Sequence, residues 1–159
     1  MNIKEVLNDK NVDFSGIPLP YFLIGLLSAF ENRFQAMADK TMKEISWKQF
    51  FFFFFINMCK ESPTINELAE IMGSSHQNVK QILLKLEKKD FVKIIIDKDD
   101  KRKQRILLTE HCKEFCQKND AMSQAIMESL FYQISPEQLQ TTIKTIIQVE
   151  DNLKKLEGE

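Results

Sequence analysis

The side chains best suited to chemistry in this sequence are amides, amines and guanidines gathered between Ser74 and Arg105. Residues 80 to 105 hold ten Lys or Arg against five Asp or Glu, so this segment carries +5 while the rest of the chain carries −6. No acid lies between Ser74 and Leu86. Amides can pair with adenine edges, and Lys can reach guanine acceptors or phosphate oxygens. This segment predicts a nucleic-acid partner, which the net charge of −1 for the whole chain conceals.

Little else in the chain could carry out catalysis. It has two histidines and four glycines, and it lacks the GxSxG, HExxH and glycine-rich phosphate-loop motifs. We therefore expect no enzyme, no cofactor and no metal.

The cysteines leave one alternative open. A metal or redox site is one interpretation of a cluster of neighbouring residues, namely Glu110, His111, Cys112, Glu114 and Cys116. Cysteines of this kind are more often small buried hydrophobes, and the same interpretation is favoured for Cys59. Three cysteines without a regular spacing predict thiols and no disulfide framework.

Length and composition predict one compact domain with appended helices. The chain has 159 residues, 43% of them apolar and 28% charged, with only four glycines and four prolines. Its longest apolar run, Phe50 to Ile56, is far shorter than the roughly 20 residues that a membrane-spanning helix needs. The first residues do not resemble a signal peptide. The expected location is therefore the cytoplasm, with no membrane partner.

Helical patterns flank the charged segment. Apolar residues recur at three- and four-residue steps from Pro20 to about Met42, which predicts a long first helix. A capping box at Ser46 to Gln49 opens a second helix containing six consecutive phenylalanines, Phe50 to Phe55. Because a helix that is apolar on every side must be buried on every side, we expect it at the centre of the domain. Further helices are predicted from Thr109 to about Phe131 and after a cap at Ser135.

Two short helices and a hairpin are predicted between these flanks. A capping box at Thr64 opens a helix that Gly73 ends, and Ser75 caps the next helix one turn later, which is helix-turn-helix spacing. The second helix of this pair is expected to stop near Asp90 and to bury a stripe of Val79, Ile82, Leu83 and Leu86. Strands are predicted over 91–96 and 105–109, joined by a charged loop without Gly or Pro. The fold class is therefore mainly α with a small β-hairpin wing (α+β), a winged helix-turn-helix.

The exposed face of the second helix is the predicted DNA-binding surface. In helix-turn-helix proteins this helix enters the major groove, and its first turn makes most base contacts. The residues predicted to bind DNA from this helix are Ser75, His76, Gln77, Asn78, Lys80, Gln81 and Lys85. For His76, a DNA contact and a partly exposed polar side chain are about equally expected. A charged helix face is often simply a solvated surface. The sequence of the hairpin is therefore needed to distinguish a DNA-binding surface from a solvated one.

The hairpin resembles the wing of the MarR family of bacterial transcriptional regulators. The resemblance rests on Asp100-Lys101-Arg102 followed, after six residues, by Thr109 with Leu108 before it, which matches the family's Asp-x-Arg and Leu-Thr signature. Further matches in register are Ser46 with Gln49, the run 65–69 and the run 86–89. The resemblance spans residues 46 to 109, and the helices on either side fit the family's dimerisation region.

This resemblance implies a homodimeric repressor at an inverted-repeat operator. Residues 45–109 would form the DNA-binding lobe, while 1–44 and 110–159 would form a helical dimerisation region. The wing contacts implied are Asp100, Lys101, Arg102 and Lys103. Among them Arg102 would reach the minor groove, and Asp100 would orient it.

Two positions depart from the family's pattern. Asp90 stands where the family usually has Gly after the recognition helix, and Asp tolerates left-handed backbone moderately well. Cys112 stands where Gly usually follows the Leu-Thr pair, and the backbone there is expected to continue as helix. The reactive cysteine of the family's peroxide sensors lies near the chain's start and matches none of Cys59, Cys112 and Cys116.

Two alternatives concern function. The phenylalanine run could line a pocket for a small aromatic effector, although core packing is the favoured interpretation because aromatic stripes mostly fill volume. The winged helix could also serve as an adaptor that binds a protein. The acid-free helix and Arg102 favour DNA, whereas an interaction insensitive to salt would favour the adaptor.

Overall fold

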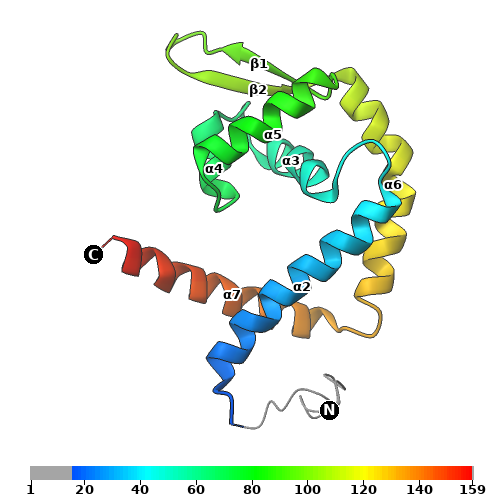
Figure 1. The fold of residues 1–159 in the computed structure, drawn as a ribbon, viewed down its shortest axis with the longest axis vertical. Helices are drawn as coiled ribbons and strands as arrows, with labels where there is room; N and C mark the ends of the chain where they lie inside the picture. Colours follow the sequence, from blue (N-terminus) through cyan, green and yellow to red (C-terminus); the bar gives the residue numbers. More distant parts are fainter. Residues whose placement is uncertain (1–15, 159) are drawn as a thin grey trace. The chain divides into compact units, whose positions relative to one another are not determined.

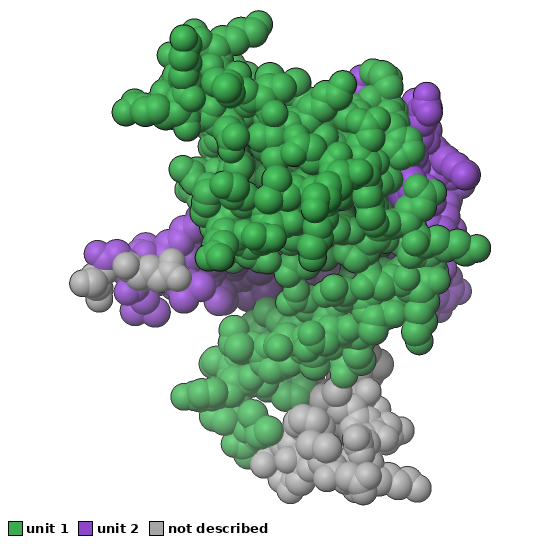
Figure 2. Space-filling model, turned by 45° about the horizontal axis from the view of Figure 1, so that its top comes forward, with its two compact units in different colours: residues 1–112 green, residues 113–159 purple. Residues whose placement is uncertain are grey.

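The computed structural model describes residues 16–158, so the first fifteen residues of the predicted dimerisation region lie outside it. The chain divides into two compact units, residues 1–112 and 113–159 (Figure 2). The boundary falls inside a helix, since α6 begins at Glu110. Among the described residues, no helix is both long and apolar enough to cross a membrane.

The first unit contains the predicted winged helix-turn-helix (Figure 1). Its elements, in chain order, are α2 (Leu19–Thr41), α3 (Trp47–Met58), α4 (Ile65–Ile71), α5 (His76–Lys88), β1 (Val92–Ile96) and β2 (Gln104–Leu108). The strands form an antiparallel hairpin in which Val92 pairs with Leu108 and Ile96 with Gln104. The structure thus confirms the fold class predicted from the pattern of helices, turn and hairpin.

The helices begin at the predicted caps. Ser46, Thr64 and Ser135 each form a capping box, in which the hydroxyl accepts from the backbone three residues on and that residue's side chain accepts in return. These reciprocal bonds satisfy amide groups that an α-helix leaves without partners at its start. A local sequence signal therefore determines where three of the helices begin.

The phenylalanine helix departs from its prediction. Phe52 and Phe53 are buried, but Phe54 is 55% exposed and the other three phenylalanines of the run are half-buried. The expectation that α3 is buried on every side is therefore wrong. Its buried face packs through Phe53, whose ring stacks on Phe91 with centroids 5.4 Å apart. One face of a helix can join the core while the opposite face stays at the surface, whatever its composition.

Both departures from the family's pattern are accommodated as predicted. Asp90 adopts a left-handed backbone with φ of 59°, and Cys112 lies within α6, fully buried. Thr109 ties the junction together, since its hydroxyl donates to the Asp90 carbonyl at 2.5 Å and its Oγ1 accepts from the Cys112 backbone at 3.1 Å. The wing is therefore attached firmly to both flanking helices.

The second unit consists of the remainder of α6 (Glu110–Leu130) and of α7 (Pro136–Glu157). Most apolar side chains of α7 face outward, with Ile147 at 53%, Leu153 at 52% and Leu156 at 71% exposure. These exposed apolar side chains are spread around α7, since Ile147 and Leu156 lie nine residues apart and so on opposite sides of the helix.

Candidate nucleic-acid interface

The turn between α4 and α5 is closed by backbone bonds and one glycine. The Gly73 amide donates to the Glu70 carbonyl at 3.1 Å and the Ser74 amide to the Ala69 carbonyl at 2.9 Å. Gly73 has a φ of +55°, a left-handed backbone conformation that residues other than glycine adopt only at a cost in free energy. This short connection sets the direction in which α5 leaves the turn.

Two residues predicted to bind DNA also build the start of α5. The Ser75 hydroxyl accepts from the Asn78 amide at 3.3 Å, and the Asn78 side chain donates to the Ser74 hydroxyl at 2.8 Å. Ser75 is therefore the N-cap of α5, and one donor of the Asn78 amide is already in use.

The outer face of α5 is polar apart from Leu84, which is 37% exposed. Val79, Leu83 and Leu86 are fully buried, which leaves the opposite face outward. The predicted DNA-binding residues are all exposed: Ser75, His76, Gln77, Asn78, Lys80, Gln81 and Lys85. The first acid of α5, Glu87, accepts from the Ile94 amide of β1 at 3.0 Å and so braces the wing. A surface of amides and amines without carboxylates can approach both bases and phosphates.

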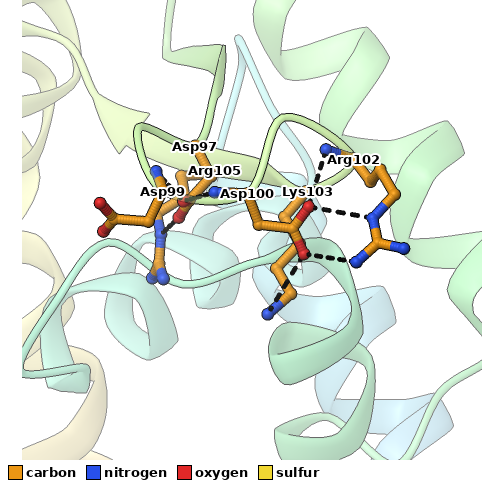
Figure 3. A network of polar contacts seen from close by, with 6 residues as sticks. All are labelled: Asp97, Asp99, Asp100, Arg102, Lys103 and Arg105. Atoms are coloured by element: carbon orange, nitrogen blue, oxygen red, sulfur yellow. Dashed lines mark hydrogen bonds and ion pairs between the residues drawn. The ribbon is translucent and has the colours of Figure 1, made fainter.

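At the wing tip, Asp100 holds Arg102 in place (Figure 3). The guanidinium Nε and one terminal nitrogen donate to the two carboxylate oxygens at 3.1 and 3.4 Å, and the Arg102 backbone amide donates at 3.1 Å. Bonds from Arg102 hold the pKa of Asp100 below its usual value. The Arg102 side chain is nonetheless 91% exposed. The ion pair therefore restricts the guanidinium without covering it. Lys101 and Lys103 are exposed beside it.

Asp97, which was not among the predicted site residues, organises the same loop. Its side chain is only 6% exposed; Oδ1 accepts from the backbone amides of Asp99 and Asp100, each at 2.8 Å, while Oδ2 pairs with Arg105. The Arg105 guanidinium, followed by those two amides, lowers the pKa of Asp97 to about 2. The sequence does contain a signal for this turn. Asp97 lies two and three residues before the amides of Asp99 and Asp100, and Asp commonly caps amides at this spacing in turns.

Arg105 connects the wing to the helix-turn-helix. Its terminal nitrogen donates to the Ser62 carbonyl at 2.6 Å, and the next residue, Ile106, donates its amide to the Pro63 carbonyl at 2.9 Å. Thr64 forms an isolated bridge with Arg105. The segment that precedes α4 is thereby paired to β2, so hydrogen bonds join the wing to the helix-turn-helix.

An apolar cavity of about 430 Å³ lies behind the turn, between α2, α3 and the start of α5. Its walls include the rings of Phe34, Trp47, Phe51 and Phe55. The ring of Phe34 meets Trp47 edge-on at 5.1 Å. Trp47 is 5% exposed, and its buried Nε1 makes no hydrogen bond with any described residue. The size and lining are typical of a small-molecule site.

The three cysteines are thiols, and Cys112 is buried. Within residues 16–158, no group of three His, Cys, Asp or Glu side chains is arranged to hold a metal ion.

These elements define a winged helix-turn-helix, and comparison with known proteins places the fold more narrowly. No protein-family model matches the chain, and no curated protein matches it in sequence. Solved structures do match. A MarR/EmrR family transcriptional regulator from Acinetobacter sp. ADP1 has a TM-score of 0.76 at 13% identity, covering 87% of this chain and 99% of its own.

Two further structures agree. A MarR protein from Peptoclostridium difficile has a TM-score of 0.76 at 17% identity, covering 92% of this chain and 95% of its own. MepR from S. aureus, solved as a complex with DNA, has a TM-score of 0.72 at 18% identity, covering 86% and 99%. The fold is therefore that of the MarR-family transcriptional regulators, as the wing signature predicted.

Proposed function

We propose that this protein is a sequence-specific DNA-binding transcriptional regulator of the MarR type, a non-enzymatic repressor that acts in the cytoplasm. The observation that carries the proposal is that an exposed Arg102, paired with Asp100, and the first turns of α5, which carry no acid, belong to the same compact unit. Like-folded proteins solved with DNA, MepR and FabT of Streptococcus pneumoniae, support it.

In this proposal α5 reads base edges in the major groove through Gln77, Gln81 and Lys85, while Arg102 enters the adjacent minor groove. Arg in a narrow minor groove responds to negative potential, and so to DNA shape more than to base identity. A homodimer would bind two half-sites about 10 to 10.5 base pairs apart, or a multiple of that, in an inverted repeat.

The test is binding to DNA from upstream of the protein's own coding sequence, against scrambled DNA, across a salt series. We expect a preference for the upstream DNA and an affinity that falls as salt rises. Arg102→Ala should weaken binding by roughly tenfold or more and reduce the salt slope by about one. Arg33→Ala, which removes an exposed arginine from α2, is the matched control. A binding affinity that does not change with salt concentration would favour the protein-binding adaptor instead.

A small aromatic effector that releases the DNA is the second part of the proposal. The 430 Å³ cavity lined by aromatic rings supports it: Trp47 forms part of its wall, and the Nε1–H of this ring has no hydrogen-bond partner among the described residues. The cavity is also lined by Gly73 and Ser74 of the turn and by Asn78 of α5, so an occupant could bias the direction of α5.

Thermal unfolding with a panel of planar aromatic compounds that carry a hydrogen-bond acceptor tests this part. A ligand that binds only the folded protein raises the melting temperature. Trp47→Phe keeps an aromatic ring but removes the donor, so the shift should shrink in this variant. A shift of equal size in both proteins would mean that Trp47 Nε1 takes no part in binding.

A further inference from the structure

One apolar side chain lies on the outer face of α5. Leu84 is 37% exposed, whereas Val79, Leu83 and Leu86 of the same helix are fully buried. The core therefore uses the opposite side of the helix and leaves Leu84 at the surface. A single exposed leucine is ordinary on a protein, so its surroundings determine whether it can have a role.

Leu84 lies in the middle of the predicted DNA-binding surface. Residues three, four and seven apart share one face of an α-helix, and at these distances from Leu84 stand Gln77, Lys80, Gln81 and Lys88. All four are exposed, and the first three are residues predicted to bind DNA. A duplex that contacts these side chains would therefore also cover Leu84 and remove it from water.

The chemistry of leucine restricts what it can contact in the major groove. Leucine has no donor or acceptor, so a polar base edge placed against it would lose its water without gaining a hydrogen bond. The C5-methyl group of thymine is the apolar feature that the major groove presents. Contact between these two apolar groups is favourable because both leave water.

We propose that Leu84 selects thymine at one position of each half-site by packing against its C5-methyl group. The inference rests on the proposed function and deepens it, because it assigns a base preference to a residue outside the predicted set. Since the helix lies in the groove, its length sets the position of this base. Leu84 is about 10 Å along the helix axis from Gln77, or roughly three base steps. The thymine should therefore lie about three base pairs from the base that Gln77 contacts.

A scan of single methyl groups tests the proposal. Each thymine of the duplex from upstream of the coding sequence is replaced in turn by deoxyuridine, which pairs in the same way but lacks the methyl group. Affinity is measured for wild type, Leu84→Ala and Leu84→Met, the last of which keeps an apolar side chain of similar volume. Leu107→Ala is the matched control, since Leu107 is also 37% exposed but lies on β2. Circular dichroism checks the folding of each variant.

We expect one thymine in each half-site at which loss of the methyl group weakens wild-type binding about fourfold, the factor for one methyl group left without its contact. Leu84→Ala should bind the unmodified duplex roughly tenfold more weakly than wild type, because both half-sites lose the contact. It should be indifferent to deoxyuridine at these thymines, so the two changes are not additive. Leu84→Met should keep the sensitivity. The salt slope should be the same for all variants, because the contact involves no phosphate.

Two outcomes overturn the thymine proposal while leaving the regulator intact. One is a wild-type protein that prefers the upstream DNA but is insensitive to every deoxyuridine. The other is a scan of Leu84→Ala that matches the scans of wild type and Leu107→Ala. If wild type does not prefer the upstream duplex to scrambled DNA, the proposed function and the thymine contact fall together.

Discussion

Asp97 uses both carboxylate oxygens inside the wing, and this determines which cations are available to a partner. Arg105 is paired to it and to the Ser62 carbonyl, so its charge is internal to the fold. Arg102 is also paired, but its side chain is 91% exposed and remains accessible. The two arginines therefore have different roles. Arg105 stabilises the wing, and Arg102 is accessible at its surface.

Replacement of Asp97 by Asn should destabilise the protein in a pH-dependent way. The pKa of Asp97 is lowered to about 2 in the fold, chiefly by Arg105, from an ordinary value near 3.8. Its contribution is therefore complete above about pH 4 and is lost as the pH falls through 2. Urea unfolding of wild type and Asp97→Asn should differ at pH 7, and the gap should close toward pH 2. A gap that is unchanged at pH 2 would contradict the ion pair.

The pairing of Asp100 with Arg102 could be predicted because the two residues are neighbours in a known signature. The role of Asp97 could not, since a run of charges does not show which carboxylate meets which amide. The contact of Arg105 with Ser62 joins segments 43 residues apart, and nothing local in the sequence marks it.

At the scale of elements, the sequence predicts helix caps and turns well. It predicts less well which face of a helix is buried. Capping boxes depend on residues three apart, and the turn at Gly73 depends on one backbone conformation, so both are visible locally. The exposure of Phe54 depends on which elements lie against α3, and periodicity cannot supply this for a helix apolar on all sides.

The turn at Gly73 gives a prediction at this scale. A Cβ added there meets no atom within 4 Å, so the cost of substitution is the left-handed backbone alone. Gly73→Ala should destabilise the protein by about 1 kcal/mol, and Gly73→Asn by less, because Asn adopts this conformation more readily. Denaturant unfolding measures both. Equal stability of Ala, Asn and wild type would show that the strain is relieved by movement of the turn.

At the scale of the molecule, each of the two units has a long helix with exposed apolar side chains. On α2 these include Leu19, Tyr21, Ile24 and Phe30, and on α7 they include Ile143, Ile147 and Leu156. Burial of apolar surface against a second copy is the simplest way to recover this free energy. The homodimer predicted from the family resemblance is therefore the assembly we propose.

Ile147→Asp should convert the dimer to monomer, because a carboxylate would have to lose its hydration in an apolar interface. Sedimentation measures the mass directly. Thr145→Asp adds the same charge at a neighbouring exposed position of α7 and should leave the dimer intact. If both variants sediment as wild type does, α7 is not the interface. Loss of the dimer should also remove the advantage of the inverted repeat over an isolated half-site, so that the monomer binds both weakly and with similar affinity.

The bonds that Asp97 makes in the wing loop have a thermodynamic consequence for recognition. A disordered loop would have to be ordered on meeting DNA, at a cost of about 1–2 kcal/mol for each residue fixed. Here the Asp99 and Asp100 amides are bonded before any partner arrives, so this entropy is lost during folding and not during binding. Affinity for DNA and stability of the loop should therefore fall together in variants that loosen it, even when every DNA-contacting side chain is retained.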